Sequence, residues 1–481
     1  MTTKTAITVI PGDGVGMEVV TAAMRVMEAA NASVEWEICD AGKKVFERGI
    51  ATGVPQETLV SLSRTHVALK GPLETPIGYG GKSANVTLRK MFETYGNLRP
   101  VKELPGVITP FSGRGIDLVV VRENVEDLYA GIEHMQTADV AQCLKLVSRK
   151  GCEKIVRLAF EVARAEGRKS VHCCTKANIM KMTEGLLKQV FEEISPEYPE
   201  IMPYQILVDN CAHQLVRRPE QFEVIVTTNM NGDILSDLTS GLVGGLGLAA
   251  SSNIGSDIAI FEAVHGSAPD IAGKNIVNPI AIILSSVLML NHIGQTEVAN
   301  AIEHAVFCTL ERGIMTSDLA PQGNGVGTKE FTEAVVKNLG IRSIRWSTRE
   351  AKPIQLTPAH SPVVTKKTSE YQIIGADIFI ESGLEPQELG SGLEALITEE
   401  PLRLKMMSNR GTKVYPTTSI EPDCVDHYRC RFVFKAGIEG DESMILKLLQ
   451  TIGIKYRWMH VELLRYFDGK KGYTLAQGEE E

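Results

Sequence analysis

Ile116-Asp-Leu-Val-Val-Val-Arg122 is the stretch of sequence that decides the fold. All of its residues except the second and the last are large and apolar. A nearly continuous apolar run of this length is typical of a strand that is buried on both faces of a parallel sheet, because a strand with one face in water alternates instead. We therefore expect a central sheet that is covered on both sides.

Strand and helix patterns alternate on both sides of this run. We expect strands at residues 6–10, 33–39, 67–72, 170–174, 206–208 and 224–227, with helices such as 153–166 and 179–193 between them. Alternation of this kind is typical of α/β proteins. The glycines at 12, 14 and 16 are not spaced as in the G-x-G-x-x-G of dinucleotide sites, so we expect only a tight turn there.

The composition is that of an ordinary globular protein with more than one domain. At 481 residues the chain is too long for one compact core, and a net charge of −9 argues against a nucleic-acid-binding surface. The longest apolar run, residues 280–290, is too short to span a membrane. Nine cysteines without a metal-binding spacing, and no sign of a signal or transit peptide, favour a cytoplasmic protein with reduced thiols.

The C-terminal part is expected to form a separate domain at 371–481, because residues 341–370 have the Ser, Thr, Pro and Lys content of a linker. We expect strands at 371–380, 402–407, 428–435 and 455–464 and helices at 386–397 and 442–451. This βαββαβ order predicts a ferredoxin-like α+β domain. Arg431-Phe-Val-Phe434 is similar to an RNA-binding strand, but ordinary alternation explains it better. We expect an interaction or regulatory module.

Gly81-Lys-Ser-Ala-Asn-Val-Thr-Leu-Arg-Lys90 carries the first candidate site residues. If Ser83 caps a helix, Asn85 and Arg89 lie near its N-terminal end, where free N–H groups favour anions. The set is completed by two further arginines, Arg99 and Arg122. Guanidinium groups bind carboxylates bidentately, so the set predicts a site for a small polycarboxylate. Each arginine taken alone is as readily explained as a surface ion-pair partner.

Five motifs follow one another along the chain. They are Lys70-Gly-Pro-Leu-Glu-Thr-Pro76, Ser83-Ala-Asn-Val-Thr-Leu-Arg89, Arg122-Glu-Asn-Val-Glu-Asp-Leu-Tyr129, Asn231-Gly-Asp-Ile-Leu-Ser-Asp237 and His265-Gly-Ser-Ala-Pro269. Together they resemble the decarboxylating dehydrogenases of the isocitrate and isopropylmalate dehydrogenase family over about residues 5–340. The long C-terminal extension is similar to that of a Thermus-like subgroup of bacterial isocitrate dehydrogenases.

The resemblance implies a two-domain catalytic core over residues 1–340. The large domain is expected to comprise about 1–95 and 244–340, and the small domain about 96–243. Within the small domain, a segment of about 130–150 is implied to form a clasp that is exchanged between two subunits. A homodimer with shared active sites follows from this arrangement.

Ser83 and Asn85 decide the expected substrate. The pair looks like the isocitrate branch of the family, in which these two side chains meet the substrate's extra carboxylate. The resemblance therefore implies oxidation of isocitrate, followed by loss of CO₂ to give 2-oxoglutarate. Homoisocitrate, tartrate or isopropylmalate-type oxidation is the alternative within the family.

Asp233 and Asp237 are four residues apart, so on a helix their carboxylates share one face. Oxygen ligands of this kind suit Mg²⁺ or Mn²⁺. The spacing by itself favours a helix cap and a solvated residue instead. The resemblance favours the metal site and adds Asp209, reaching in from the other subunit, as a third ligand.

Tyr129 and Lys176 are the acid–base candidates. Lys176 follows an expected strand and precedes a helix, where α/β proteins commonly hold their sites, although taken alone it fits a surface lysine. The resemblance implies that Lys176, contributed by the neighbouring subunit, takes the hydroxyl proton. Tyr129 is then implied to protonate the enolate that decarboxylation leaves.

The resemblance also implies a nicotinamide cofactor, for which we predict NAD. Asp270 and Ile271 stand where NADP-using members commonly have Lys and Tyr, and an aspartate repels the 2′-phosphate of NADP. The residues implied to contact the cofactor are Glu74, Thr75 and Glu262 at the nicotinamide half and His265, Gly266, Ser267, Ala268, Asp270, Ile271, Val277 and Asn278 at the adenosine half.

Overall fold

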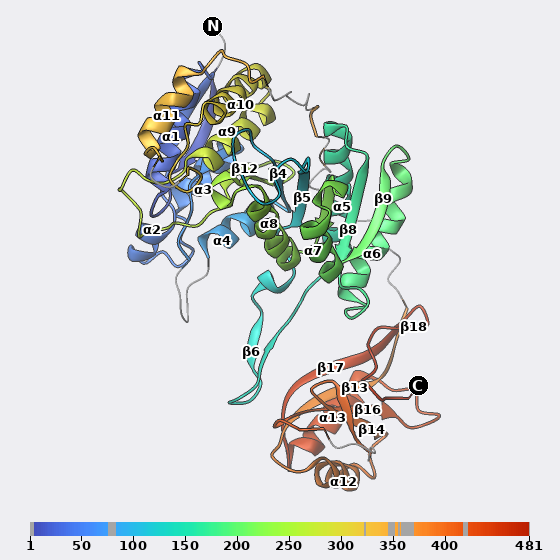
Figure 1. Cartoon of the computed structure of the whole chain (residues 1–481). Helices are drawn as coiled ribbons and strands as arrows, with labels where there is room; N and C mark the ends of the chain where they lie inside the picture. Colours follow the sequence, from blue (N-terminus) through green and yellow to red (C-terminus); the bar gives the residue numbers. More distant parts are fainter. Residues whose placement is uncertain are drawn as a thin grey trace. The chain divides into compact units, whose positions relative to one another are not determined.

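The chain forms two compact units in the computed structural model (Figure 1). The first unit consists of Met1–Ala130 and Lys145–Ser361, and the second of Gly131–Leu144 and Pro362–Glu481. The described residues are 4–75, 83–321, 324–344, 352–354, 356, 370–416 and 422–480. Most of the expected linker at 341–370 therefore lies outside the described residues, and the expected division of the core into a large and a small domain stays a prediction.

A ten-stranded sheet runs through the first unit. Its strands are β1 (Thr5–Ile10), β2 (Val34–Ile38), β3 (Val67–Lys70), β4 (Gly96–Lys102), β5 (Asp117–Glu123), β8 (Ser170–Thr175), β9 (Met202–Leu207), β10 (Val224–Thr227), β11 (Ala250–Ile254) and β12 (Ala259–Ala263). They lie in the order β2-β1-β3-β12-β11-β4-β5-β10-β8-β9. Three neighbouring pairs in the middle, β12–β11, β11–β4 and β4–β5, are antiparallel, and the remaining pairs are parallel.

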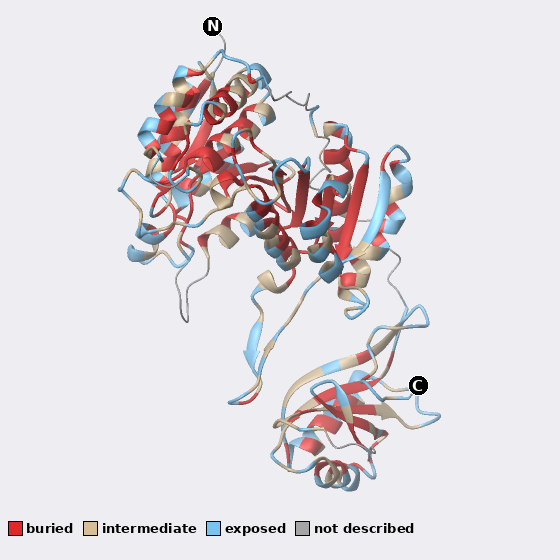
Figure 2. Ribbon diagram, in the orientation of Figure 1, coloured by how far each residue is buried: buried red, intermediate tan, exposed pale blue. Residues whose placement is uncertain are grey.

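Helices cover both faces of this sheet. One face packs against α1 (Gly16–Ala29), α5 (Arg149–Glu166), α6 (Thr183–Ile194), α9 (Ile280–His292), α10 (Thr296–Glu311) and α11 (Thr328–Lys337). The other packs against α3 (Gln56–Thr65), α4 (Ala84–Met91), α7 (Val208–Arg217) and α8 (Asn229–Val243). The short α2 (Lys43–Glu47) follows β2. Figure 2 shows most of these strands buried between the helices, while the edge strand β9 is largely exposed.

Strand β5 confirms the prediction made from residues 116–122. Val119 and Val121 belong to the core cluster on one face of the sheet, while Leu118 and Val120 belong to the cluster on the other. Each of these four side chains is at most 1% exposed. The strand is therefore buried on both faces, and the α/β fold class is confirmed.

The second unit contains a six-stranded antiparallel sheet in the order β15-β14-β16-β13-β17-β18. Its strands are β13 (Tyr371–Glu381), β14 (Leu402–Asn409), β15 (Thr412–Tyr415), β16 (His427–Phe434), β17 (Arg457–Phe467) and β18 (Lys470–Lys471), and its helices are α12 (Pro386–Leu396) and α13 (Glu442–Gly453). The four longest strands follow the chain as βαββαβ, and each is antiparallel to its neighbours. This confirms the expected ferredoxin-like α+β domain, to which β15 and β18 are additions.

Arg431 on β16 does not behave as an RNA-binding side chain. It is 1% exposed, donates to both carboxylate oxygens of Asp377 at 2.8 and 2.7 Å, and donates to Glu479 at 2.7 Å. A guanidinium held in this way is part of the domain's interior and is not available to a phosphate or a base. The ordinary interpretation of this strand is therefore the better one.

Residues Gly131–Leu144 form a small hairpin of β6 (Glu133–Met135) and β7 (Ala141–Cys143) within the second unit. Thr137 donates to Asp426 at 3.1 Å, and the His460 Nδ1 atom lies 3.3 Å from the amide oxygen of Gln142. This is the segment expected to act as a clasp. Its exchange between subunits stays a prediction.

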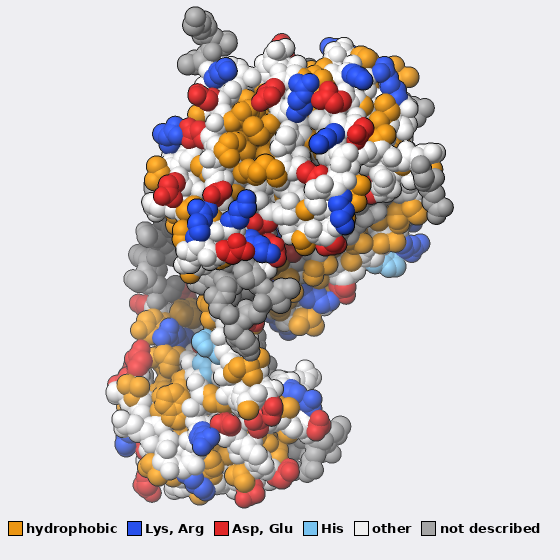
Figure 3. Space-filling view, turned by 90° about the vertical axis from the view of Figure 1, so that its left-hand side faces the viewer, with side chains coloured by type: hydrophobic (Ala, Val, Ile, Leu, Met, Phe, Trp, Pro, Cys, Tyr) orange, Lys and Arg blue, Asp and Glu red, His pale blue; other side chains and the backbone are white. Residues whose placement is uncertain are grey.

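Surface charge and helix hydrophobicity are relevant to two classes of partner, nucleic acids and membranes. On the face shown in Figure 3, basic and acidic side chains are interspersed, so this face presents no extended basic surface of the kind that nucleic-acid binding uses. Among the described residues, no helix combines the length and apolar content that a membrane span needs.

Candidate active site

The candidate site lies where the sheet changes from parallel to antiparallel. The strand register places Asn253 of β11 opposite Asn97 of β4, and Asn97 opposite Arg122 of β5. Beside them, Glu262 of β12 lies opposite Lys70 of β3. All five side chains are buried, so each needs a polar partner within the protein. A buried polar row therefore crosses five adjacent strands.

Two arginines from this part of the sheet contact the first turns of α8. Arg122 donates to Asp233 and makes three further contacts of 2.8–3.1 Å with Asn229. The guanidinium of Arg99 lies 3.3 Å from Asp233 and 3.4 Å from Asp237. Both aspartates thus lie on one side of α8, next to two buried cations.

Electrostatics at this cluster keep the carboxylate of Asp233 ionised. Burial raises the pKa of Asp233, but the charge of Arg122 and a hydrogen bond from Tyr129 outweigh it and leave the pKa below its usual value. Burial lowers the pKa of Arg122 to about 10. The guanidinium therefore remains charged at neutral pH.

Tyr129 joins the same cluster from a short 3₁₀ turn, Leu128–Ala130. Its hydroxyl donates to Asp233 at 2.7 Å, and the guanidinium of Arg122 lies 5.0 Å from its ring centre. Burial and the hydrogen bond to Asp233 raise its pKa. The phenol is therefore protonated at neutral pH and is able to donate a proton.

Arg89 reaches the cluster indirectly, through Glu262. Its guanidinium lies 3.2 Å from one oxygen of Glu262, while Lys70 lies 2.5 Å from the other. Burial opposes ionisation of this carboxylate, but the charges of Lys70 and Arg89 prevail and lower its pKa. Glu262, expected at the nicotinamide half of the cofactor, therefore helps to hold Arg89, one of the arginines expected to bind the substrate.

Thr75, Ser83 and Asn85 lie close to the start of α4. Ser83 occupies the position before the helix, as expected, but its side chain makes no capping hydrogen bond and accepts instead from Thr75 at 3.0 Å. Asn85 donates to the carbonyl of Leu73 at 3.4 Å. Glu74 forms an ion pair of 3.6 Å with Lys43. Pro76, Gly81 and Lys82 of the quoted motifs lie outside the described residues.

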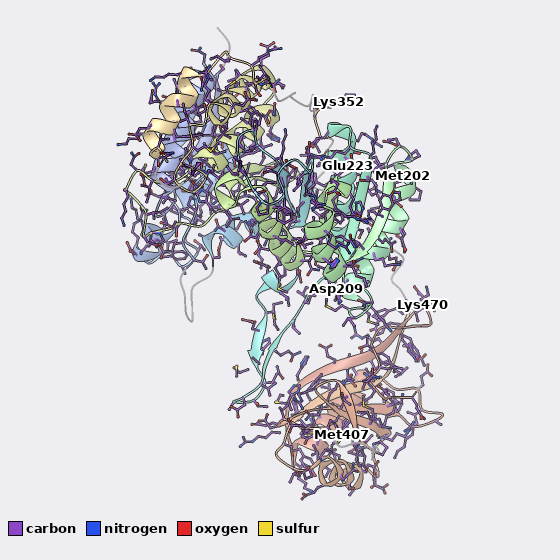
Figure 4. The ribbon with its side chains drawn as sticks, in the orientation of Figure 1. Met202, Asp209, Glu223, Lys352, Met407 and Lys470 are labelled. Carbon is purple, nitrogen blue, oxygen red and sulfur yellow. The ribbon has the colours of Figure 1, made fainter. Side chains whose placement is uncertain are left out.

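Lys176 and Asp209 form a separate pair, 3.0 Å apart. Lys176 lies in the loop after β8, and Asp209 lies in the first turn of α7, where Figure 4 labels it. Within the described part of the chain, no group of three acidic, histidine or cysteine residues is arranged to hold a metal ion. Asp209 is therefore not brought to Asp233 and Asp237 within one chain.

The loop that begins at His265 packs against the glycine turn after β1, where the N–H of Val15 donates to the carbonyl of Ser267 at 2.8 Å. Burial lowers the pKa of His265, and its Nε2 atom is buried without a hydrogen-bond partner among the described residues. Gly266, Ala268 and the buried Val277 belong to the same region. Asn278 donates to Asp318 at 2.9 Å.

Several buried polar residues of the site had no sequence signal. Lys70, Asn97 and Asn253 support the arginines, although none was singled out from the sequence. The available hints were that Lys70 begins the first quoted motif and that Asn97 lies two residues before Arg99. Glu184, a helical glutamate with 0% exposure, accepts the N–H of Lys176 at 3.0 Å.

Relatives that match nearly the whole chain include proteins of Thermus thermophilus and Rickettsia bellii. An isocitrate dehydrogenase [NADP] of Thermus thermophilus is 58% identical over 98% of this chain and 96% of its own length. An isocitrate dehydrogenase [NADP] of Rickettsia bellii is 41% identical over 99% of each chain. A crystal structure of a Thermus thermophilus protein matches with a TM-score of 0.96 at 58% identity and covers 99% of this chain and 97% of that one.

The prediction of NAD as the cofactor is wrong, because both relatives carry NADP in their names. The prediction depended on repulsion between Asp270 and the 2′-phosphate. In the structure Asp270 is exposed in a turn, with Ile271 half-buried beside it and the exposed Lys274 close by in sequence. A charge in water is screened and its side chain is free to turn away, so Asp270 is a weak barrier to a phosphate.

Family models match both parts of the chain. The model of isocitrate/isopropylmalate dehydrogenase matches residues 6–335, and the model of the bacterial isocitrate dehydrogenase C-terminal domain matches residues 371–479. The resemblance inferred from the five motifs is therefore confirmed. The chain belongs to the isocitrate/isopropylmalate dehydrogenase family and carries the C-terminal domain of its bacterial isocitrate dehydrogenases.

Proposed function

We propose that this protein catalyses the metal-dependent oxidative decarboxylation of isocitrate to 2-oxoglutarate and CO₂, with hydride transfer to NADP. The observation that carries the proposal is the cluster of Arg99, Arg122 and Tyr129 around Asp233. It combines cations for carboxylates, a protonated phenol and acidic oxygens in one place. The Thermus thermophilus and Rickettsia bellii relatives, which match over nearly their full length, are named isocitrate dehydrogenase [NADP].

The arginines are the groups that bind and orient the substrate. Arg99 and Arg122 are 6% and 1% exposed and are held by neighbouring side chains, so their guanidinium groups lose little freedom when a carboxylate binds. Arg89 supplies a third guanidinium from α4. Ser83 and Asn85, at the start of the same helix, are assigned to the substrate's extra carboxylate.

Asp233 and Asp237 fit a divalent cation of the Mg²⁺ or Mn²⁺ type. Their side chains are 37% and 55% exposed, so carboxylate oxygens remain accessible beside the arginines. Hard cations of this type prefer such oxygen ligands and share them with the substrate. Asp209 of the partner subunit would complete the ligand set. A bound cation would supply Lewis-acid polarisation of the substrate's oxygens.

Lys176 and Tyr129 are assigned opposite proton transfers. Lys176 takes the proton of the substrate hydroxyl in the neighbouring chain's site, and Tyr129 later donates its phenolic proton to the carbon that has lost CO₂. The raised pKa of Tyr129 suits this role, because the group must stay protonated until the enolate forms.

The cofactor is assigned to the loops beside this cluster. Glu74, Thr75 and Glu262 would line the nicotinamide half, which supplies hydride acceptance. The buried Nε2 atom of His265, which has no partner among the described residues, is available to a polar edge of the adenine. The adenosine half would contact the residues already expected there: Gly266, Ser267, Ala268, Asp270, Ile271, Val277 and Asn278.

A homodimer with shared active sites is supported by exposed apolar side chains on two elements, α8 and the edge strand β9. On α8, Met230 and Ile234 are 38% and 60% exposed. On the edge strand β9, Met202 and Tyr204 are 57% and 46% exposed, and Figure 4 labels Met202 there. Exposed apolar side chains on a helix and on a sheet edge are suited to contact with a second copy of the chain.

The proposed function is tested by assaying the purified protein with isocitrate, NADP and Mn²⁺. We expect equal amounts of NADPH, 2-oxoglutarate and CO₂, loss of activity with excess EDTA and recovery when Mg²⁺ or Mn²⁺ is restored. Homoisocitrate, tartrate and isopropylmalate serve as matched substrates, and NAD as the matched cofactor. Higher kcat/KM with any of these three acids, or with NAD, would contradict the proposal.

A further inference from the structure

Lys145 lies at the centre of a buried charge cluster that the proposed mechanism does not use. Its Nζ atom is 2.6 Å from Asp127 and 2.7 Å from Glu184. The side chains of Lys145, Asp127 and Glu184 are 13%, 1% and 0% exposed. Burying two carboxylates around one ammonium costs free energy unless the carboxylate oxygens also accept hydrogen bonds. The donors to those oxygens therefore show which parts of the chain the cluster fixes in place.

Asp127 connects the turn that carries Tyr129 to the start of α8. One of its carboxylate oxygens accepts the N–H of Leu128 at 2.8 Å, and the other accepts the N–H of Met230 at 2.9 Å. Its backbone φ is +68°, in the left-handed region that non-glycine residues seldom adopt. The side-chain contacts therefore hold a strained residue directly before the Tyr129 turn.

Glu184 connects the loop of Lys176 to the same helix start. One oxygen accepts the N–H of Lys176 at 3.0 Å. The other accepts the hydroxyl of Thr228, the residue before α8, at 3.0 Å. Glu184 thus fixes the backbone of Lys176, the proposed proton acceptor, relative to the helix that carries Asp233 and Asp237.

We propose that Lys145 is a positioning residue, which holds the Tyr129 turn and the Lys176 loop against the start of α8 by neutralising Asp127 and Glu184. The inference rests on the proposed function. Without the ammonium, two buried carboxylates repel each other, and relief requires one of them to move or to take up a proton. Either change disturbs a contact that now holds a turn or a loop, because an oxygen that carries a proton no longer accepts an N–H. If active sites are shared, Lys145 also couples the site that uses this chain's Tyr129 to the site that receives its Lys176.

The test compares Lys145→Met with Lys145→Arg and with Lys188→Met in the full-length protein. Lys188 forms a 2.8 Å pair with Glu192 and its side chain is 41% exposed, so it is the matched control. We expect Lys145→Met to lower kcat by about 100-fold, as a misplaced catalytic group does, with KM for isocitrate and NADP changed less. Lys145→Arg should restore much of the loss, and Lys188→Met should behave as wild type.

Activity is expressed per site that binds isocitrate and Mn²⁺, measured by calorimetry, so that partial unfolding is not counted as lost catalysis. If Lys145→Met does not fold, Lys145→Gln takes its place with the same expectation, because its amide still hydrogen bonds to one carboxylate. If the wild-type protein is active and Lys145→Met has an unchanged kcat per binding site, Lys145 is not a positioning residue, while the proposed function stands. A wild-type protein inactive on isocitrate and NADP would overturn the proposed function, and this inference with it.

Discussion

At the scale of single residues, the site depends on arginines that are buried before any substrate arrives. Arg99 donates to Asn97 at 2.7 Å and to Ser236 at 2.6 Å in addition to its contacts with α8. An arginine in water would lose rotamer freedom on binding a carboxylate. Here the surrounding side chains have already fixed the guanidinium, so binding energy is not spent on ordering it.

Arg99→Met tests this account at one side chain. We expect KM for isocitrate to rise by about 30–150-fold, because a charge-assisted bidentate contact contributes about 2–3 kcal/mol. KM for NADP should change far less. Arg157→Met is the control, since Arg157 pairs with Glu197 at the surface. Equal increases in both Michaelis constants would show that Arg99 supports the fold and does not bind the substrate.

At the scale of elements, the sequence predicts most of the apolar strands, although not β12 (Ala-Ile-Phe-Glu-Ala), and it predicts polar strands poorly. The run at 116–122 was recognised because its burial on both faces requires apolar residues on both faces. Strands β4 and β11 were not recognised: their sequences, Gly96-Asn-Leu-Arg-Pro-Val-Lys102 and Ala250-Ser-Ser-Asn-Ile254, are polar but buried. Their burial depends on hydrogen bonds between distant residues, such as Asn97 to Asn253 at 3.0 Å, and no local pattern shows these.

The same limit applies to the site. Arg99, Arg122, Asp233 and Tyr129 were identified through motifs, and the structure brings them together. The buried charges that support them were missed. Lys70 begins a quoted motif but was given no role, and a lone lysine such as Lys145 is usually a surface residue. Cofactor choice failed for a related reason: the sequence shows that Asp270 is charged but not that it is exposed.

Asn253→Ala tests whether the polar strands are held by this network. Asn253 accepts from Asn97 and Asn124 at 3.0 and 2.9 Å and donates to Glu262 at 2.7 Å. Removing it leaves buried groups unpaired, so we expect the free energy of unfolding to fall by about 2–4 kcal/mol. Denaturant unfolding measures the change, with the exposed Gln189→Ala as control. If Asn253→Ala lowers the free energy of unfolding no more than the control does, the hydrogen-bond network does not hold these strands.

At the scale of the whole molecule, the proposed catalytic and metal-binding residues fall into two separate groups within one chain. Tyr129, Asp233 and Asp237 lie in one cluster, while Lys176 and Asp209 bind each other. The exposed apolar side chains of α8 and the edge strand β9 lie on elements that neighbour this second pair in the sheet and helix layers. A two-fold dimer in which each chain lends Lys176 and Asp209 to its partner accounts for both observations.

Mixing two inactive variants tests this central claim most directly. Tyr129→Phe and Lys176→Met are each expected to have little activity as pure proteins. When they are unfolded together and refolded, a mixed dimer with shared sites has one site with both residues intact and one with both replaced. Random mixing then restores about a quarter of the wild-type activity. If Tyr129 and Lys176 act within one chain, every site keeps one defect, and a mixture as inactive as its components would contradict the account.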